Sequence, residues 1–136
     1  MNFGTIIDRY SNEIRLKKVG EKSMFEVKGT FAIYKNEEQF FGQLQYTLLK
    51  ALISEGSINA AAKKCHISYQ QAWSIADKMN RNSPIPILIR YKGGKDGGGC
   101  RVGAYGYELI KIYEELHSKF VKELVGLNAN LDSCLL

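Results

Sequence analysis

Two helix patterns near the middle of the chain are separated by only two residues, His66 and Ile67. The residues before this junction form a narrow face of small apolar side chains, which suits close helix packing. The second helix is expected to begin at Ser68, whose hydroxyl can accept the amide hydrogen of Gln71 while the Gln71 side chain reaches back, as in a capping box. A connection this short is typical of a helix-turn-helix.

A further helix is expected immediately before this pair. Gly42 opens a stretch in which apolar residues recur at three- and four-residue steps and give one apolar face. Gly56 is a natural stop, because glycine adopts the left-handed cap conformation without steric cost. Ser57 follows at once and can cap the next helix. The sequence thus predicts three helices in succession.

Two paired strands are expected after these helices. Pro84 and Pro86 end the helical region, because each proline lacks an amide hydrogen and restricts the residue before it. Alternation from residue 85 to 90 predicts one strand, and residues 100–102 can pair back as the second. Glycines dominate the segment 93–99 between them, which predicts a flexible hairpin tip.

The two ends of the chain carry weaker patterns. Residues 1–23 are polar and mixed in charge, and we expect an extension there that can include a short helix around Ile6, Ile7 and Tyr10. From Met24 the alternation indicates a strand to Ile33, interrupted at Gly29, and residues 39–41 can return as a second strand after a turn. A long helix is then expected from near Tyr105, with its last turns fraying before Gly126 and a flexible tail over 126–136.

These patterns together predict a mainly α fold with a small β content (α+β). The expected architecture is a winged helix-turn-helix over residues 24–125, with an N-terminal β-hairpin and a long C-terminal helix. Its apolar stripe is the candidate dimer contact and comprises Leu109, Ile112, Tyr113, Leu116 and Phe120. The alternative is that this stripe covers only its own core.

Positive charge is concentrated in one segment. The chain carries a net charge of +5, and residues 57–101 contain eight basic residues against Asp77 and Asp96, a balance of +6. Such localisation is typical of a surface that binds a polyanion, although a solvated basic surface is the plainer reading. The candidate phosphate contacts on the helices and the hairpin are Lys63, Lys64, Arg81, Arg90, Lys92, Lys95 and Arg101.

The helix that begins at Ser68 is the candidate reading element. A major groove about 12 Å wide admits one helix, and polar side chains on its exposed face can bond base edges. The candidate contacts on this helix are Ser68, Tyr69, Gln70, Gln71, Ser74 and Lys78. Tyr69 and Trp73 lie on one flank, where both are expected to act mainly as core anchors.

Other classes of function find little support. The cysteines at 65, 100 and 134 and the two histidines lack metal-ligand spacing, so we expect no metal, no cofactor and no disulfide. The glycine-rich tip lacks the Gly-Lys-Ser/Thr ending of a nucleotide-binding loop. No nucleophile with its base can be assembled, so the chain is not expected to be an enzyme. No apolar run or signal peptide is present, which predicts a cytoplasmic protein without a membrane partner.

The motifs resemble those of one family, the ModE-type regulators, over roughly residues 24–120. The matching segments are Gly56-Ser57-Ile58, Ala60-Ala61-Ala62, Ile67-Ser68-Tyr69, Ala72-Trp73, Met79-Asn80, Gly93-Gly94, Gly97-Gly98-Gly99, Tyr105-Gly106, Leu109-Ile110 and Tyr113. The resemblance implies a dimeric winged helix-turn-helix in which residues 68–74 begin the recognition helix and the glycine-rich segment is the wing. The chain departs from the family at Gly103, where threonine is usual, and leaves no room for a molybdate-binding domain.

The main hypothesis is therefore a homodimeric, sequence-specific regulator that binds double-stranded DNA, of ModE/LysR-like winged-helix type and without an effector domain. Its terminal helices are expected to form the dimer. The alternative is a protein-interaction adaptor that uses the same fold to dock a partner. A remote third possibility is a module that responds to an oxyanion at the dimer seam.

Overall fold

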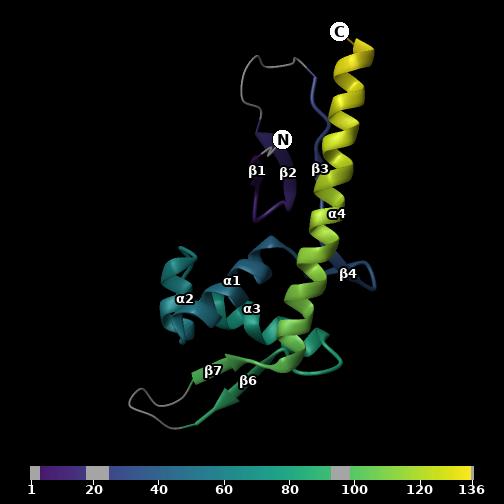
Figure 1. Cartoon of the computed structure of the whole chain (residues 1–136). Helices are drawn as coiled ribbons and strands as arrows, with labels where there is room; N and C mark the ends of the chain where they lie inside the picture. The colour runs from purple at the N-terminus through teal and green to yellow at the C-terminus, as the bar shows by residue number, and fades with distance from the viewer. Residues whose placement is uncertain (1–3, 18–24, 93–98, 136) are drawn as a thin grey trace.

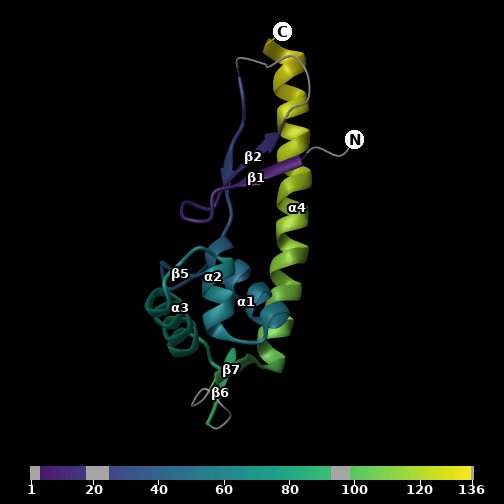
Figure 2. The same cartoon turned by 90° about the vertical axis from the view of Figure 1, so that its left-hand side faces the viewer.

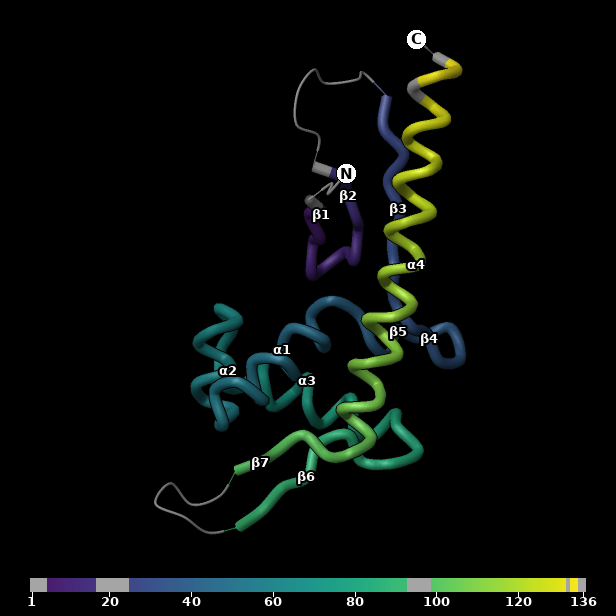
Figure 3. Tube along the Cα trace, in the orientation of Figure 1, coloured from purple at the N-terminus to yellow at the C-terminus, as the bar shows by residue number. Residues whose placement is uncertain are grey.

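The computed structural model describes residues 4–17, 25–92 and 99–135 (Figures 1 and 3). The elements of this part of the chain are β1 Gly4–Ile7, β2 Glu13–Lys17, β3 Gly29–Thr30, β4 Ile33–Lys35, β5 Glu38–Phe41, α1 Gln43–Glu55, α2 Ile58–Lys64, α3 Tyr69–Asn82, β6 Leu88–Tyr91, β7 Gly99–Val102 and α4 Ala104–Leu135. The strands form small antiparallel sheets, ordered β1-β2-β3, β4-β5 and β6-β7. The predicted α+β class is confirmed, and the arrangement is compatible with a winged helix.

The three short helices begin and end where their local signals predict. Gly56 ends α1 in the left-handed conformation at φ 79°, and its amide bonds the Leu52 carbonyl. The Ser57 hydroxyl accepts the Ala60 amide at 3.2 Å and caps α2. Ser68 and Gln71 form the expected capping box of α3, with both bonds at 3.0 Å. Local hydrogen bonds therefore fix these helix boundaries.

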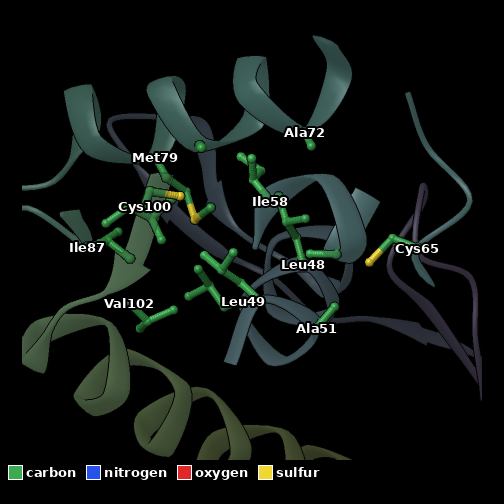
Figure 4. Close-up of a cluster of buried hydrophobic side chains, with 14 of the residues drawn as sticks. Leu48, Leu49, Ala51, Ile58, Cys65, Ala72, Met79, Ile87, Cys100 and Val102 are labelled. Carbon is green, nitrogen blue, oxygen red and sulfur yellow. The ribbon is translucent and has the colours of Figure 1, made fainter. Parts of the chain in front are cut away.

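One hydrophobic core joins α1, α2, α3, β6, β7 and the start of α4. Its fully buried members include Leu49 on α1, Ala72 on α3 and Ile87 before β6 (Figure 4). Tyr113 on α4 also belongs to this core. Small residues such as Ala61 let the helices approach closely, as the sequence predicts. We call this unit, α1–α3 with β4–β7 and the first turns of α4, the head.

Asn80 ties the β6-β7 hairpin to α3. Its side-chain oxygen accepts the amides of Ile87 at 3.0 Å and Leu88 at 2.9 Å, and its nitrogen donates to the Leu88 carbonyl at 2.8 Å. The hairpin pairs Leu88 with Val102 and Tyr91 with Gly99. The predicted glycine-rich tip falls on residues 93–98, outside the described residues.

The N-terminal segment contains strands, so the expected short helix around Ile6, Ile7 and Tyr10 is wrong. β1 and β2 form a hairpin in which Ile7 pairs with Ile14. A tight turn joins the strands, with Asn12 at the left-handed φ of 59° and Tyr10 exposed in the turn. Burial alternates along β2, so that Ile14 and Leu16 pack against α4 while Arg15 between them is exposed. This period of two is that of a strand and not of a helix.

The expected strand from residue 24 to 33 is also divided between two sheets. Gly29 and Thr30 form β3, which pairs with β2, whereas β4 begins at Ile33 and pairs with β5. The predicted turn before residue 39 is confirmed, with Asn36 at the left-handed φ of 50°. The change of partner sheet occurs at residues 31–32, two residues after Gly29, where the sequence predicted the interruption.

The sequence predicted that the last helix frays before Gly126. Instead, α4 continues to Leu135. At a rise of 1.5 Å per residue, its 32 residues span about 48 Å. α4 leaves the head and runs along the N-terminal sheet (Figures 1 and 2). We call β1–β3 with the part of α4 beyond His117 the stalk. Within the described residues, no helix is both long and apolar enough to cross a membrane.

Candidate nucleic-acid interface

α3 presents a polar face to solvent. Ala72, Ala76 and Met79 on its opposite face are buried in the head. The exposed residues of α3 include Tyr69, Gln70, Gln71, Ser74, Asp77, Lys78 and Arg81. The helix is thus anchored on one side and accessible on the other, which a reading element requires.

Two of the predicted contact residues on α3 already serve its first turn. The Ser68 hydroxyl accepts the Gln71 amide, and the Gln71 side chain accepts the Ser68 amide. Their side-chain oxygens are therefore engaged in capping. Gln70 and Ser74 lie on the exposed face without a side-chain hydrogen bond in the described part of the chain.

Two of the predicted phosphate contacts, and Lys78 of the predicted recognition helix, form ion pairs with acidic residues of the chain. Lys64 lies 3.2 Å from Glu55. Lys78 lies 3.2 Å from Glu38 on β5. Arg90 pairs with Asp77 on α3. All three pairs are solvent-accessible, so each contributes at most about 1 kcal/mol and can exchange partners at low cost.

The other predicted phosphate contacts divide into two groups. No ion pair is recorded between described residues for Lys63 on α2, Arg81 on α3, Lys92 after β6 or Arg101 on β7, and all four side chains are exposed. Lys95 lies outside the described residues. Among these predicted contacts, the uncompensated positive charge therefore comes from α2, α3 and the β6-β7 hairpin.

Arg90 connects the hairpin to α3. Its guanidinium lies over the Trp73 ring at 4.3 Å from the centroid and bonds Asp77, one turn further along the helix. Cation–π contacts at accessible sites contribute about 0.5–1 kcal/mol. The sequence indicated Arg90 as basic, but its role as a bridge depends on the fold that places β6 beside α3.

The expectation that Tyr69 and Trp73 are core anchors is right for only one of them. Trp73 is half-buried and packs against the main core. Tyr69, by contrast, is 50% exposed, and its ring meets Trp73 edge to face at 6.2 Å. Tyr69 therefore belongs to the accessible surface of α3.

The β1-β2 turn supplies two positioning residues that the sequence did not reveal. Asn12 is buried; its oxygen accepts the Gln43 amide at 2.9 Å, and its nitrogen donates to Gln39 at 3.0 Å. It thus caps α1 from another element, in place of Gly42, where a Cβ would lie 2.4 Å from the Asn12 oxygen. Arg9 bonds the Cys65 carbonyl at the end of α2. Both residues contact segments that are far away in the sequence, so no local sequence pattern predicts these contacts.

The described residues offer little for catalysis or metal binding. Among them, no three histidine, cysteine, aspartate or glutamate side chains lie close enough together to hold a metal ion. Burial raises the pKa of the Cys65 and Cys100 thiols, which keeps both protonated and poorly nucleophilic. Burial also raises the pKa of Tyr113 to about 12. These groups act in packing.

Comparison with known proteins supports a regulator. No protein-family model matches the chain. The molybdenum transport protein ModE of Azotobacter vinelandii is 39% identical over 85 residues, which is 62% of this chain and 32% of that protein. The transcriptional regulator ModE of Haemophilus influenzae is 42% identical over 57% of this chain and 30% of its own length. The DNA-binding transcriptional dual regulator ModE of Escherichia coli is 38% identical over 59% and 30%.

The chain spans about a third of the length of these relatives. The match also extends to the molybdenum-pterin-binding protein MopB of Rhodobacter capsulatus, at 33% identity over 67% of this chain. The resemblance indicated by the motifs is confirmed: the homologues of this chain are ModE and MopB proteins, several of them named as transcriptional regulators.

Proposed function

We propose that this chain is a winged helix-turn-helix protein that binds double-stranded DNA in a sequence-specific way. In this proposal α3 enters the major groove as the recognition helix, and the β6-β7 hairpin is the wing. The observation that carries it is the Arg90 bridge, which holds the hairpin against the polar face of α3. Two elements that contact DNA must share one surface, and this bridge fixes them side by side.

The side chains of this surface fit two different tasks. Gln70 and Ser74 are free to bond base edges, which carry sequence information. The unpaired charges of Lys63, Arg81 and Arg101 suit phosphates, which position a protein without specifying sequence. Lys64, Lys78 and Arg90 would first have to leave their acidic partners, so we expect them to contribute less.

A homodimer formed through α4 completes the proposal. Leu109 and Tyr113 of the predicted stripe are buried in the head, and Phe120 packs in the stalk against Phe31. Ile112 and Leu116, in contrast, are 48% and 42% exposed. Leu127 continues the same face two to three turns further along. We propose that a second copy covers this face, so that two recognition helices reach half-sites about 34–36 Å apart, or a multiple of that distance.

We propose that the chain regulates genes by binding DNA in the cytoplasm and that it has no catalytic activity. The proposal does not include the sensing of an effector molecule. The names of some relatives refer to molybdenum, and those relatives are about three times as long as this chain. A thermal-shift titration with molybdate or tungstate tests the remaining alternative. Under the proposal neither oxyanion changes the melting temperature.

A gel-shift titration across salt concentration tests the main proposal. At the proposed interface, four basic residues of each protomer form no ion pair with a described residue, which predicts a slope of log K against log salt of about −7 for a dimer. The double charge reversal Lys63→Glu/Arg81→Glu should abolish retention. A matched control, Lys111→Glu/Lys122→Glu on the side of α4 away from Ile112 and Leu116, changes the net charge equally and should retain DNA. A flat salt response, or equal loss in both variants, would refute the proposal.

A protein-docking adaptor is the second candidate, and the outer face of the β6 region favours it. Ile85, Ile89 and Tyr91 there are 55%, 37% and 47% exposed. An adaptor would dock its partner through these apolar groups. The charge reversal on α2 and α3 would then leave partner capture intact, whereas Ile89→Asp/Tyr91→Asp would abolish it.

A further inference from the structure

A surface recess lies along the exposed flank of α3, on the side that faces the β6-β7 hairpin. Its volume is about 410 Å³, and it is lined by Tyr69, Gln70, Trp73, Ser74, Asp77 and Arg81. The two aromatic rings form its apolar part, at the beginning of the helix. The other side chains are polar and surround them. Tyr69 is half exposed at the edge of this space, and Trp73 is its one ring contact among the described residues.

The aromatic wall is held in place before any ligand arrives. Arg90 lies over Trp73 at 4.3 Å and also bonds Asp77, so both groups are fixed from the hairpin. Tyr69 in turn meets the edge of Trp73 at 6.2 Å. Because these side chains are already ordered, little conformational entropy is lost when a ligand contacts them.

The electrostatics of the recess allow a polyanion to approach. Asp77 would repel phosphates, but Arg90 balances its charge. Arg81, at the far end of the recess, makes no ion pair with any described residue and is exposed. A duplex that lies along α3 therefore meets neutral aromatic groups first and a cation at the end.

We propose that the recess between Tyr69 and Trp73 receives the C5-methyl group of a thymine. This inference rests on the proposed binding of DNA through α3. In the major groove the thymine methyl is the apolar group that distinguishes an A·T pair, and apolar side chains recognise it. Gln70 lies beside the two rings and can form the paired hydrogen bonds that glutamine makes with adenine. One short stretch of α3 thus reads both bases of a single pair.

The experiment begins with selection of bound sites from a random duplex library by the full chain. Each thymine of the selected site is then replaced in turn by deoxyuridine, which removes only the methyl group, and the dissociation constant is measured. Burial of one methyl group predicts a loss of about fourfold for one half-site and about fifteenfold when both half-sites are changed.

A variant connects the effect to the recess. In Tyr69→Ala, the same deoxyuridine replacement should change affinity less than twofold, because the wall that contacts the methyl is gone. Tyr34→Ala is the matched control, since Tyr34 is 62% exposed on β4. It should keep the full fourfold sensitivity. Folding of each variant is checked by circular dichroism at 222 nm, because Tyr69 contacts the Trp73 ring and its removal alters the tryptophan fluorescence directly.

The outcomes separate the two proposals. If the library yields no enriched site, the proposed DNA-binding function fails. If a site is enriched and bound tightly, but every thymine tolerates deoxyuridine, the function stands and the recess has another role. Sensitivity that persists unchanged in Tyr69→Ala likewise overturns the assignment of the methyl group to this recess.

Discussion

The head and the stalk are stabilised in different ways. Nineteen buried residues form one continuous core in the head, whereas the stalk core has only Ile14, Leu16 and Leu124 fully buried among the described residues. The stalk relies more on hydrogen bonds of buried polar side chains, such as those between the Asn128 side chain and the backbone of Val27. The stalk therefore depends more than the head on individual polar contacts.

Phe31 is the place where the two regions meet. Its ring packs against both clusters and lies 5.2 Å from Tyr113 and 5.6 Å from Phe120. The β1-β2 turn forms a second connection, in which Asn12 bonds Gln39 and Gln43. Besides the continuous helix α4, these contacts join the head to the stalk, and mutations can address each region separately.

The largest expected effect comes from the head core. Leu49→Ala removes a side chain that is fully buried, and we expect it to lower the free energy of unfolding by about 3–5 kcal/mol. Leu124→Ala in the stalk should cost about 2–3 kcal/mol, because its smaller cluster can close around the gap. Urea unfolding gives both values. Equal losses in the two variants would contradict the difference between the regions.

Trp73 makes this measurement specific, because it reports on the head alone. Circular dichroism at 222 nm also includes all of α4. In Leu49→Ala both signals should change at one urea concentration. In Leu124→Ala the circular dichroism should begin to change before the fluorescence does, and coincident transitions would show that head and stalk unfold as one unit.

The hydrogen bonds of the Asn128 side chain stabilise the stalk. Asn128 is buried, bonds the amide and carbonyl of Val27 at 3.0 Å, and donates to the Leu124 carbonyl. Asn128→Ala removes the partner of the Val27 amide and carbonyl and should cost about 1–3 kcal/mol. Hydrogen exchange at the Val27 amide should accelerate. Asn130→Ala, on the exposed face of the same helix, is the control, and an equal loss there would show that helix propensity alone is measured.

A smaller effect is expected where the stalk caps the head. Asn12→Gly keeps the left-handed backbone without strain and removes only the side chain that caps α1, so it should cost about 0.5–2 kcal/mol. Exchange at the Gln43 amide should rise, while the stalk stays intact. Asn36→Gly makes the same change in the exposed β4-β5 turn and should be nearly neutral. Equal costs would mean that Asn12 acts only through its own turn.

The sequence predicted the head well because its signals are local. Gly56, Ser57 and the capping pair of Ser68 and Gln71 form their bonds within four residues, so the sequence pattern contains both partners. The stalk was misread for the opposite reason. The N-terminal sheet region and the last turns of α4 stabilise each other through contacts such as Val27 with Asn128, which are 101 residues apart.

The candidate site shows the same division. Residue types along α3 and the hairpin predicted which side chains are polar or basic. They did not predict that Lys78 is compensated by Glu38, that Arg90 is held by Asp77, or that Tyr69 remains exposed. Those properties depend on which elements become neighbours, and no periodic pattern in a single sequence specifies them.

The smallest expected effect is a pH dependence at the junction of the two regions. The His117 ring stacks on Tyr113 at 5.9 Å and meets Phe31 edge on at 5.7 Å, and its buried Nε2 has no hydrogen-bond partner among the described residues. Burial lowers the pKa of His117 below its ordinary 6.5. The unfolded chain therefore binds a proton more readily than the folded one, so this contribution to stability is present above pH 6.5 and is lost as the pH falls towards the folded value.

His117→Phe should flatten this dependence and raise stability slightly, because an apolar ring replaces an unpaired nitrogen. The measurement is the melting temperature between pH 8 and 5, where a change of 1 kcal/mol corresponds to about 2–8 °C for a domain of this size. His66→Asn removes the other histidine, exposed in the turn before α3, and should keep the slope of the natural chain. If the slope instead disappears in His66→Asn, the sensitive contact lies in the head, and the junction at Phe31 is insensitive to protonation.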